Sequence, residues 1–125
     1  MPDTTQRTDS ILIVEDDAHT RRLLVTLLSL SGYQAEPAAS IAQGLERLDG
    51  HAFVLLDLNL PDGLGTIVLE RIRSQRLPIR VAVISGTSDE ELVNDAARLL
   101  PDLFLHKPID VAVLLEWLGS ADRSA

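Results

Sequence analysis

Five residues of the sequence have side chains that could do chemistry together, because each lies just after a short apolar run. Glu15 and Asp16 come after the first such run, Asp57 after a second, Ser85 after a third and Lys107 after a fourth. They offer three carboxylates, one hydroxyl and one ammonium group. Crowded carboxylates raise one another's pKa or bind a cation, and oxygen ligands without sulfur or imidazole favour Mg²⁺ or Mn²⁺. The residue types therefore predict a metal site.

Mg²⁺ usually takes one or two carboxylates together with water and phosphate oxygens, which leaves one carboxylate here free to act as a nucleophile. Asp57 is the candidate nucleophile, since it ends the run expected to be a central strand. The adjacent Glu15 and Asp16 form a natural pair of metal ligands. Phosphoryl transfer depends mainly on positioning and on neutralising the charge of the phosphoryl oxygens. Lys107 and Ser85 would supply a cation and a hydroxyl donor for that purpose.

The apolar runs are expected to be buried strands of one sheet, because they are too short for helices. We expect strands over residues 11–14, 33–38, 53–56, 81–84 and 103–105. Pro37 cannot donate a hydrogen bond to a neighbouring strand, so the second strand belongs at an edge. Ligands of open parallel sheets bind at the carboxyl ends of the strands. The candidate residues should therefore converge at that end.

Segments with apolar residues at helical spacing separate these strands. Helices are expected over about residues 18–31, from the capping box of Ser40 and Gln43, around Ile67 and from about Asp110. A further helix is expected from a second capping box of Ser88 and Glu91 up to Pro101, with Leu100 on its inner side. Gly32 suits a helix C-cap, and residues 58–65 are interpreted as a loop. Five strands alternating with five helices predict an α/β fold, in which helices cover both faces of a parallel sheet.

Length and composition indicate one folded domain. The chain has 125 residues, of which 46% are hydrophobic and 24% charged. We expect a flexible polar arm over residues 1–9, a domain over 10–120 and a frayed tail over 121–125. The sequence has no cysteine, which excludes disulfides, thiolate metal sites and cysteine nucleophiles.

Targeting signals and nucleic-acid binding are not expected. No apolar run approaches the roughly 18 residues that span a membrane, and the first ten residues contain no signal-peptide core. The net charge of −8 argues against nucleic-acid binding by this domain alone. These features predict a cytoplasmic protein without membrane contact.

Several other polar and aromatic residues have structural interpretations. Asp17 stands where a helix N-cap belongs. His19, His51 and His106 show no metal-ligand spacing and are interpreted as surface residues. Phe104 is by default a packed core aromatic.

The segments ILIVEDD, LLDLNLPDG, VISG and LHKP occur in this order, and together they resemble the signatures of response-regulator receiver domains. Each segment alone is a weak signal, but four at these spacings form a specific one. The resemblance covers residues 11 to 118. It implies a CheY-like fold, a doubly wound flavodoxin-like (βα)5 unit with a five-stranded parallel sheet and the strand order 2-1-3-4-5.

The resemblance also implies roles for single residues around a metal and a phosphoryl group. Glu15 and Asp16 would bind Mg²⁺, and Asp57 would be the phosphorylated residue and a further metal ligand. Asn59 would offer its backbone carbonyl to the metal. Lys107 would contact the phosphoryl group, and its bond to Pro108 would be cis.

Ser85 and Phe104 are the switch residues that the resemblance implies, with Ser85 also contacting the phosphoryl group. Both depart from the commonest type. Ser85 replaces a threonine, which removes a methyl group but keeps the hydroxyl donor. Phe104 replaces a tyrosine, so no phenolic hydroxyl can report its position. Phe104 therefore stays open between a switch and a core role.

The leading functional hypothesis is a signalling switch of a two-component system rather than an enzyme acting on other substrates. Asp57 would accept a phosphoryl group from a sensor histidine kinase or a histidine phosphotransfer protein. The change would alter the face formed by the fourth helix, fifth strand and fifth helix, for binding a downstream protein, a covalently attached output domain or a second copy. The alternatives are an unphosphorylated receiver-like binding module and a small phosphatase that uses Asp57 as nucleophile.

Overall fold

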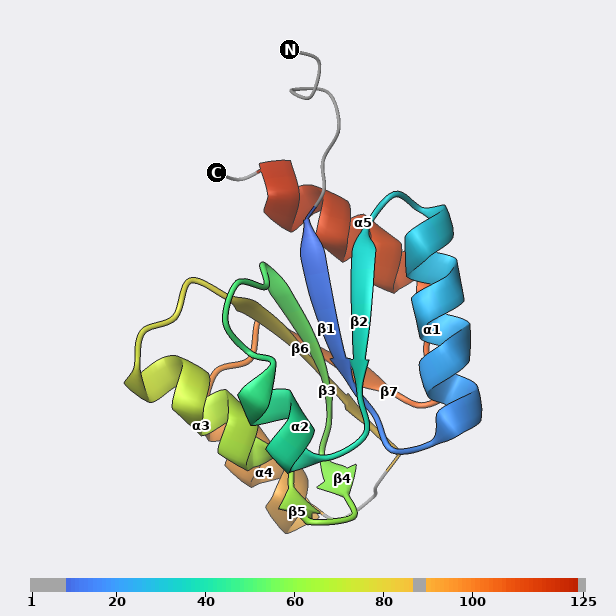
Figure 1. Ribbon diagram of the computed structural model, residues 1–125. Helices are drawn as coiled ribbons and strands as arrows, with labels where there is room; N and C mark the ends of the chain where they lie inside the picture. The colour runs from blue at the N-terminus through green and yellow to red at the C-terminus, as the bar shows by residue number, and fades with distance from the viewer. Residues whose placement is uncertain (1–8, 87–89, 124–125) are drawn as a thin grey trace.

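The computed structural model describes residues 9–86 and 90–123, the last three by their backbone alone, and a five-stranded sheet lies at its centre (Figure 1). The strands are β1 (Ser10–Val14), β2 (Gln34–Ala38), β3 (Phe53–Asp57), β6 (Arg80–Ser85) and β7 (Leu103–His106). All neighbouring strands are parallel, in the order β2-β1-β3-β6-β7. Because β6 and β7 are the fourth and fifth strands of this sheet, the predicted order 2-1-3-4-5 is confirmed. Pro37 lies in the edge strand β2, as expected.

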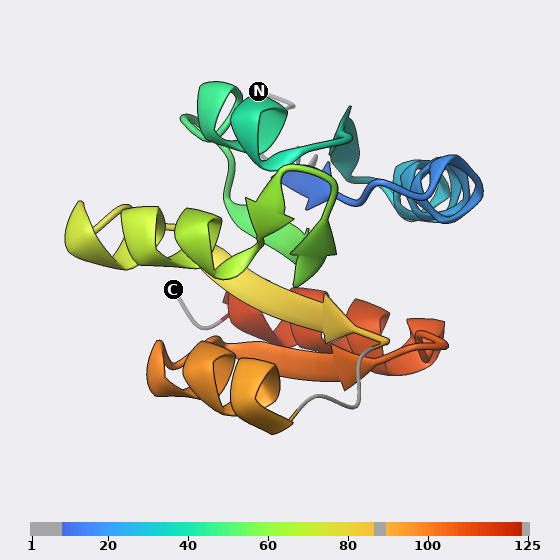
Figure 2. The ribbon, with the colours of Figure 1, turned by 90° about the horizontal axis from the view of Figure 1, so that it is seen from below.

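Helices cover both faces of this sheet (Figure 2). Within the described residues they are α1 (Ala18–Leu30), α2 (Ile41–Glu46), α3 (Thr66–Ser74), α4 (Glu90–Arg98) and α5 (Val111–Arg123). Helices α1 and α5 pack on one face, and α2, α3 and α4 pack on the other. The doubly wound α/β architecture predicted from the alternating pattern is therefore confirmed.

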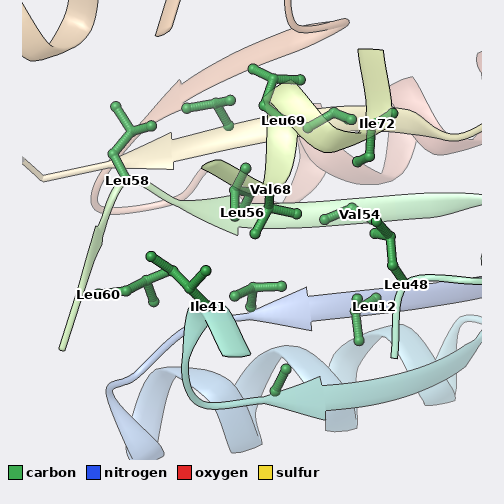
Figure 3. Packing of buried hydrophobic residues seen from close by; sticks show 14 of the residues in the cluster. Leu12, Ile41, Leu48, Val54, Leu56, Leu58, Leu60, Val68, Leu69 and Ile72 are labelled. Carbon is green, nitrogen blue, oxygen red and sulfur yellow. The ribbon is translucent and has the colours of Figure 1, made fainter. Parts of the chain in front are cut away.

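Two apolar cores form, one on each face, because successive side chains of a strand point to opposite faces. On the face covered by α2, α3 and α4, Val54 and Leu56 of β3 belong to the same core as Val68 of α3 (Figure 3). On the other face, Leu55 packs in a core with Leu114 of α5. This two-sided burial explains why the central strands are continuous apolar runs rather than alternating ones.

The helix ends follow the predicted caps. The N–H of Thr20 donates to Asp17 Oδ2 at 3.0 Å, and the N–H of Gln43 donates to Ser40 Oγ at 3.2 Å. Gly32, just after α1, has a φ of +97°, which favours glycine. Asp17 is thus the N-cap that the sequence predicted.

Two local features differ from prediction. Residues 58–65, expected to be a loop, contain a small antiparallel hairpin of β4 (Asn59–Leu60) and β5 (Gly63–Leu64), whose two-residue strands are too short to give an alternating pattern. Leu100, expected on the inner side of a helix, is 76% exposed and lies beyond the end of α4 with a φ of 54°. The residue before a proline is disfavoured in helical conformation, and Pro101 follows directly.

The expected domain boundaries are only partly covered by the described residues. Helix α5 continues to Arg123, past the boundary expected at residue 120. Residues 1–8 of the expected arm, Ser88 of the second capping box and residues 124–125 lie outside the described residues. None of the described helices has both the length and the apolar character needed to cross a membrane.

Candidate functional site

The carboxyl ends of β1 and β3 bring three carboxylates together. Glu15 and Asp16 directly follow β1, and Asp57 is the last residue of β3, its neighbour in the sheet. One carboxylate oxygen from each residue lies within 4.8 Å of the other two. Glu15 and Asp57 are only 2% and 4% exposed, whereas Asp16 is exposed. The structure thus gathers the three acidic residues selected from the sequence.

Lys107 reaches both buried carboxylates from the turn after β7. Its Nζ lies 2.8 Å from Glu15 Oε1 and 3.1 Å from Asp57 Oδ2. Its backbone N–H donates to the carbonyl of Ser85 at 2.9 Å, which ties this turn to the end of β6. The bond between Lys107 and Pro108 is cis, as the resemblance implied. One ammonium group is therefore shared by two carboxylates.

This sharing shifts the ionisation of the cluster. Burial raises the pKa of Glu15; the ion pair with Lys107 opposes that rise, and the nearby Asp57 adds to it. Burial acts to lower the pKa of Lys107, but its contacts with Glu15 and Asp57 outweigh burial and raise it. Lys107 therefore stays protonated, and its single ammonium group faces two buried carboxylates.

Backbone N–H groups orient the two buried carboxylates. The N–H of Asp17 donates to Glu15 Oε2 at 3.1 Å, and the N–H of Asn59 donates to Asp57 Oδ1 at 3.1 Å. In each case the acceptor is the oxygen that does not face Lys107. Each carboxylate is thus held at both of its oxygens, which fixes its plane.

Two residues that sequence reasoning missed shape the site. Arg21 Nη1 donates to the carbonyls of Glu15 and Asp16, at 2.8 and 3.1 Å, and so attaches α1 to the acidic segment. Gly65 lies so close to the end of β3 that a Cβ there would be 2.1 Å from the carbonyl oxygen of Asp57. An arginine early in a helix carries no special signal. Gly65 was interpreted only as a turn residue, although glycine also permits such a close approach.

The oxygen atoms of this cluster fit a hard divalent cation. Glu15 Oε1 is buried and, among the described residues, makes an ion pair with Lys107 but receives no hydrogen bond of good geometry. Buried polar atoms usually find a partner, and the oxygens of Asp16 and Asp57 lie within a few ångströms. Mg²⁺ takes oxygen ligands of this kind.

Ser85 and Phe104 lie on the neighbouring strands β6 and β7. Ser85 is fully buried at the end of β6 and is aligned with His106 of β7, while Asp57 is aligned with Ile84. Phe104 is partly buried against the core under α2, α3 and α4, and its ring centroid lies 5.2 Å from that of His106. Phe104 is therefore a packed aromatic of β7, and its switch role stays a prediction.

His51 corrects one sequence interpretation, since it was expected at the surface and is only 9% exposed. Its Nε2 lies 3.0 Å from Glu36 Oε1, and its Nδ1 lies 3.4 Å from the carbonyl of Leu48. His51 precedes β3, so it lies at the opposite end of the sheet from the carboxylates. Its burial depends on Glu36 of β2, a partner that local sequence does not reveal. His19 and His106 are exposed, as predicted.

Comparison with known proteins identifies relatives of this arrangement. Residues 11–118 match the family described as the response regulator receiver domain. The acid tolerance regulatory protein ActR of Rhizobium meliloti is 34% identical over 110 residues, which cover 85% of this chain and 56% of ActR. The chemotaxis protein CheY of Treponema pallidum is 29% identical over 88% of this chain and 80% of its own length. The chain spans little more than half the length of ActR.

Solved structures share the fold. A CheY-like response regulator receiver domain protein from Methanospirillum hungatei superposes with a TM-score of 0.84 at 27% identity, covering 92% of this chain and 94% of its own. A CheY-like receiver domain from Methylobacillus flagellatus has a TM-score of 0.78 at 32% identity, covering 91% and 98%. The sequence match extends over all five strands of the sheet except the first residue of β1, and over the three acidic residues and Lys107. The chain belongs to the response regulator receiver domain family.

Proposed function

We propose that this domain accepts a phosphoryl group on Asp57 in a reaction that requires a divalent cation. The observation that carries the proposal is the geometry of Asp57, a buried carboxylate held by Lys107 and the N–H of Asn59 within reach of two further carboxylates. Such an arrangement holds a nucleophile in place while cationic groups neutralise the incoming phosphoryl oxygens. Membership of the receiver family supports the same role.

In the proposed reaction a carboxylate oxygen of Asp57 attacks the phosphorus atom and forms a P–O bond. The bond from phosphorus to the donor breaks at the same centre, and its electron pair leaves with the donor group. With a phosphohistidine donor this is a P–N bond, and the released imidazole takes a proton from solvent. Lys107 compensates the charge of the phosphoryl group, because its Nζ already lies 3.1 Å from Asp57 Oδ2. Ser85 is the proposed hydroxyl donor at the end of β6.

Glu15, Asp16 and Asp57 are the proposed metal-binding residues, together with the backbone carbonyl of Asn59. When bound, Mg²⁺ or Mn²⁺ would supply positive charge to the phosphoryl oxygens. The response regulator TrrA from Thermotoga maritima, 22% identical to this chain, has been solved in complex with Mg²⁺ and BeF. The support in this chain is the acidic cluster and the buried Glu15 Oε1, which has an ion pair with Lys107 but receives no well-aligned hydrogen bond from the described residues.

A sensor histidine kinase or a histidine phosphotransfer protein is the proposed donor. Among the relatives, FixJ of Bradyrhizobium diazoefficiens is named a transcriptional regulatory protein, and this chain covers 57% of its length. We infer that the output is a downstream protein, an attached domain or a second copy, contacted through the face of α4, β7 and α5. Phe104 on β7 is the proposed link between the site and that face. In this proposal the domain acts as a switch and not as an enzyme on other substrates.

The intact mass of the chain after incubation with a small acyl phosphate, with and without Mg²⁺, tests this function. The expected result is a metal-dependent gain of one phosphoryl group that Asp57→Asn abolishes. Asp49→Asn is the matched control, because Asp49 is an exposed aspartate near the opposite end of β3. A wild-type chain that gains no mass under any condition would instead favour an unphosphorylated binding module.

A further inference from the structure

The side chain of Asp62 hydrogen-bonds the hairpin that follows Asp57 to α2. Asp62 lies at the tip of this hairpin, between β4 and β5. Its Oδ1 accepts a hydrogen bond from the N–H of Ile41 at 2.9 Å, and its Oδ2 accepts one from the N–H of Ala42 at 3.1 Å. We propose that Asp62 is a positioning residue of the phosphoacceptor site, which holds the hairpin on α2 so that Asn59 stays against Asp57.

Asp62 completes the capping of α2. The first N–H groups of a helix have no partner within the helix and need other acceptors. Ser40 Oγ accepts from Gln43, and the carbonyl of Ser40 accepts from Gly44. Asp62 binds the N–H groups of Ile41 and Ala42, the first two residues of the helix. The hairpin is thus part of the cap of an earlier helix, since Asp62 lies 21 and 20 residues after the two N–H groups that it binds.

A short path of contacts runs from Asp62 to the nucleophile. Along the hairpin, Leu60 pairs with Gly63 and Asn59 pairs with Leu64. At its base the N–H of Asn59 donates to Asp57 Oδ1 at 3.1 Å. Asp62 therefore lies three residues from the group that orients Asp57, without touching the carboxylate cluster itself.

The hairpin needs such an anchor because its strands have only two residues each, and an isolated hairpin is marginally stable at best. Leu60 is a second anchor, since it is buried in the same core as Ile41 (Figure 3). Apolar packing is not directional, however, whereas two hydrogen bonds to one carboxylate fix an orientation. Asp62 thus supplies the geometric part of the attachment.

The consequence for metal binding rests on the function proposed above, in which Asn59 offers its carbonyl to the cation. If the hairpin shifts, both the carbonyl and the N–H of Asn59 move relative to Asp57. Groups that orient metal ligands typically change metal affinity by about ten- to a hundredfold when removed. Loss of Asp62 should therefore weaken Mg²⁺ binding at a distance from the ligands.

The test compares Asp62→Ala with Ser40→Ala in the full chain. Ser40→Ala is the matched control, because it removes a cap from the same helix but leaves the hairpin attached. Mg²⁺ affinity is measured by calorimetry, and exchange of the Asn59 amide hydrogen is followed by NMR without metal. Asp62→Ala should weaken Mg²⁺ binding about tenfold and speed exchange at Asn59. Ser40→Ala should leave both close to wild type, and Asp62→Asn, which keeps one acceptor oxygen, should fall between.

Two outcomes overturn the proposal: equal changes in Asp62→Ala and Ser40→Ala, which would mean that only the stability of α2 matters, or no change in Asp62→Ala. Failure of the proposed function is seen separately, as a wild-type chain that binds no Mg²⁺ or takes no phosphoryl group. In that case the exchange rate of the Asn59 amide alone decides whether Asp62 positions the hairpin.

Discussion

The two ends of the sheet treat their charged side chains in opposite ways. At the amino end, Asp102 accepts a hydrogen bond from the N–H of Val81 at 2.7 Å and faces Arg73 Nη2 at 3.4 Å. Arg73 also donates to the carbonyl of Leu99 at 3.1 Å. At the carboxyl end, Glu15 and Asp57 share one lysine, and an oxygen of Glu15 receives no hydrogen bond from the described residues.

This difference separates groups that stabilise the fold from groups that are kept for binding. A carboxylate whose partners satisfy it lowers the free energy of the folded state, and its removal leaves those partners without an acceptor. Two carboxylates crowded around one ammonium group raise the free energy of the folded state. A bound cation would reduce the repulsion between the two carboxylates. We therefore expect the carboxyl end to be less stable without a ligand, in line with its proposed role in binding.

The largest expected effect comes from filling the close contact behind the nucleophile. Gly65→Ala should lower the free energy of unfolding by about 3 kcal/mol, because the new methyl group would meet the backbone of Asp57 and force it to move. It should also reduce phosphorylation. Urea denaturation and intact mass measure the two effects.

Gly32→Ala is the control for loss of glycine by itself. Gly32 has a positive φ, and a methyl group added there would meet no described residue other than its chain neighbours within 4 Å. Backbone strain therefore accounts for the cost of alanine at this position, about 1 kcal/mol. Equal losses at Gly65 and Gly32 would show that the backbone of Asp57 does not depend on the close contact.

At the amino end, Asp102→Ala should destabilise the fold by about 2 kcal/mol, because the N–H of Val81 loses its acceptor and Arg73 loses its ion pair. Asp95→Ala is the matched control, since Asp95 pairs only at the surface with Arg98 and should cost less than about 0.5 kcal/mol. Thermal and urea unfolding measure both. A cost at Asp102 no larger than at Asp95 would remove the contrast between the ends of the sheet.

Much of this organisation could be predicted from sequence because it depends on short-range patterns. Buried parallel strands are continuous apolar runs, and the residue after each run lies at the carboxyl end of the sheet. That rule alone placed Glu15, Asp57, Ser85 and Lys107 together. The caps at Asp17 and Ser40 followed from local residue types in the same way.

The features that escaped prediction depend on contacts in space that the residue types do not signal. The buried His51 ring has a partner in Glu36 of β2, whose Oε1 lies 3.0 Å from His51 Nε2. Arg21 and Gly65 act on the site through backbone carbonyls, which carry no signature in the sequence. Asp62 lies in the segment interpreted as a loop, and its hydrogen bonds to α2 depend on the folded chain. Each of these residues has a common type whose role is set by its neighbour in space.

Glu15→Gln tests the cost of crowding at the carboxyl end. Without metal, the variant should be more stable at neutral pH by about 1 kcal/mol, because the remaining Asp57 and Lys107 balance each other. Mg²⁺ binding should weaken in the same variant. Unfolding in the presence of a chelator gives the first value and calorimetry the second. A less stable metal-free variant would mean that Lys107 satisfies both carboxylates fully, and the two ends of the sheet would then be alike.

The smallest expected effect is the pH dependence contributed by Asp62, a stabilising carboxylate that lies close to the destabilising cluster. The N–H groups of Ile41 and Ala42 lower the pKa of Asp62 below its ordinary value of 3.8. Its ionised form therefore stabilises the fold above pH 3.8, and this contribution is lost as the pH falls from that value through the lower pKa of the folded state.

Asp62→Asn should remove that part of the acid sensitivity, so the difference in urea midpoint between wild type and variant should shrink as the pH is lowered from neutrality through 3.8. Ser40 caps the same helix without a charge. The difference in urea midpoint between wild type and Ser40→Ala should therefore not vary over that pH range. A constant difference for Asp62→Asn as well would mean that its carboxylate binds α2 no better ionised than neutral. The attachment of the hairpin would then depend on packing at Leu60 and not on the charge of Asp62.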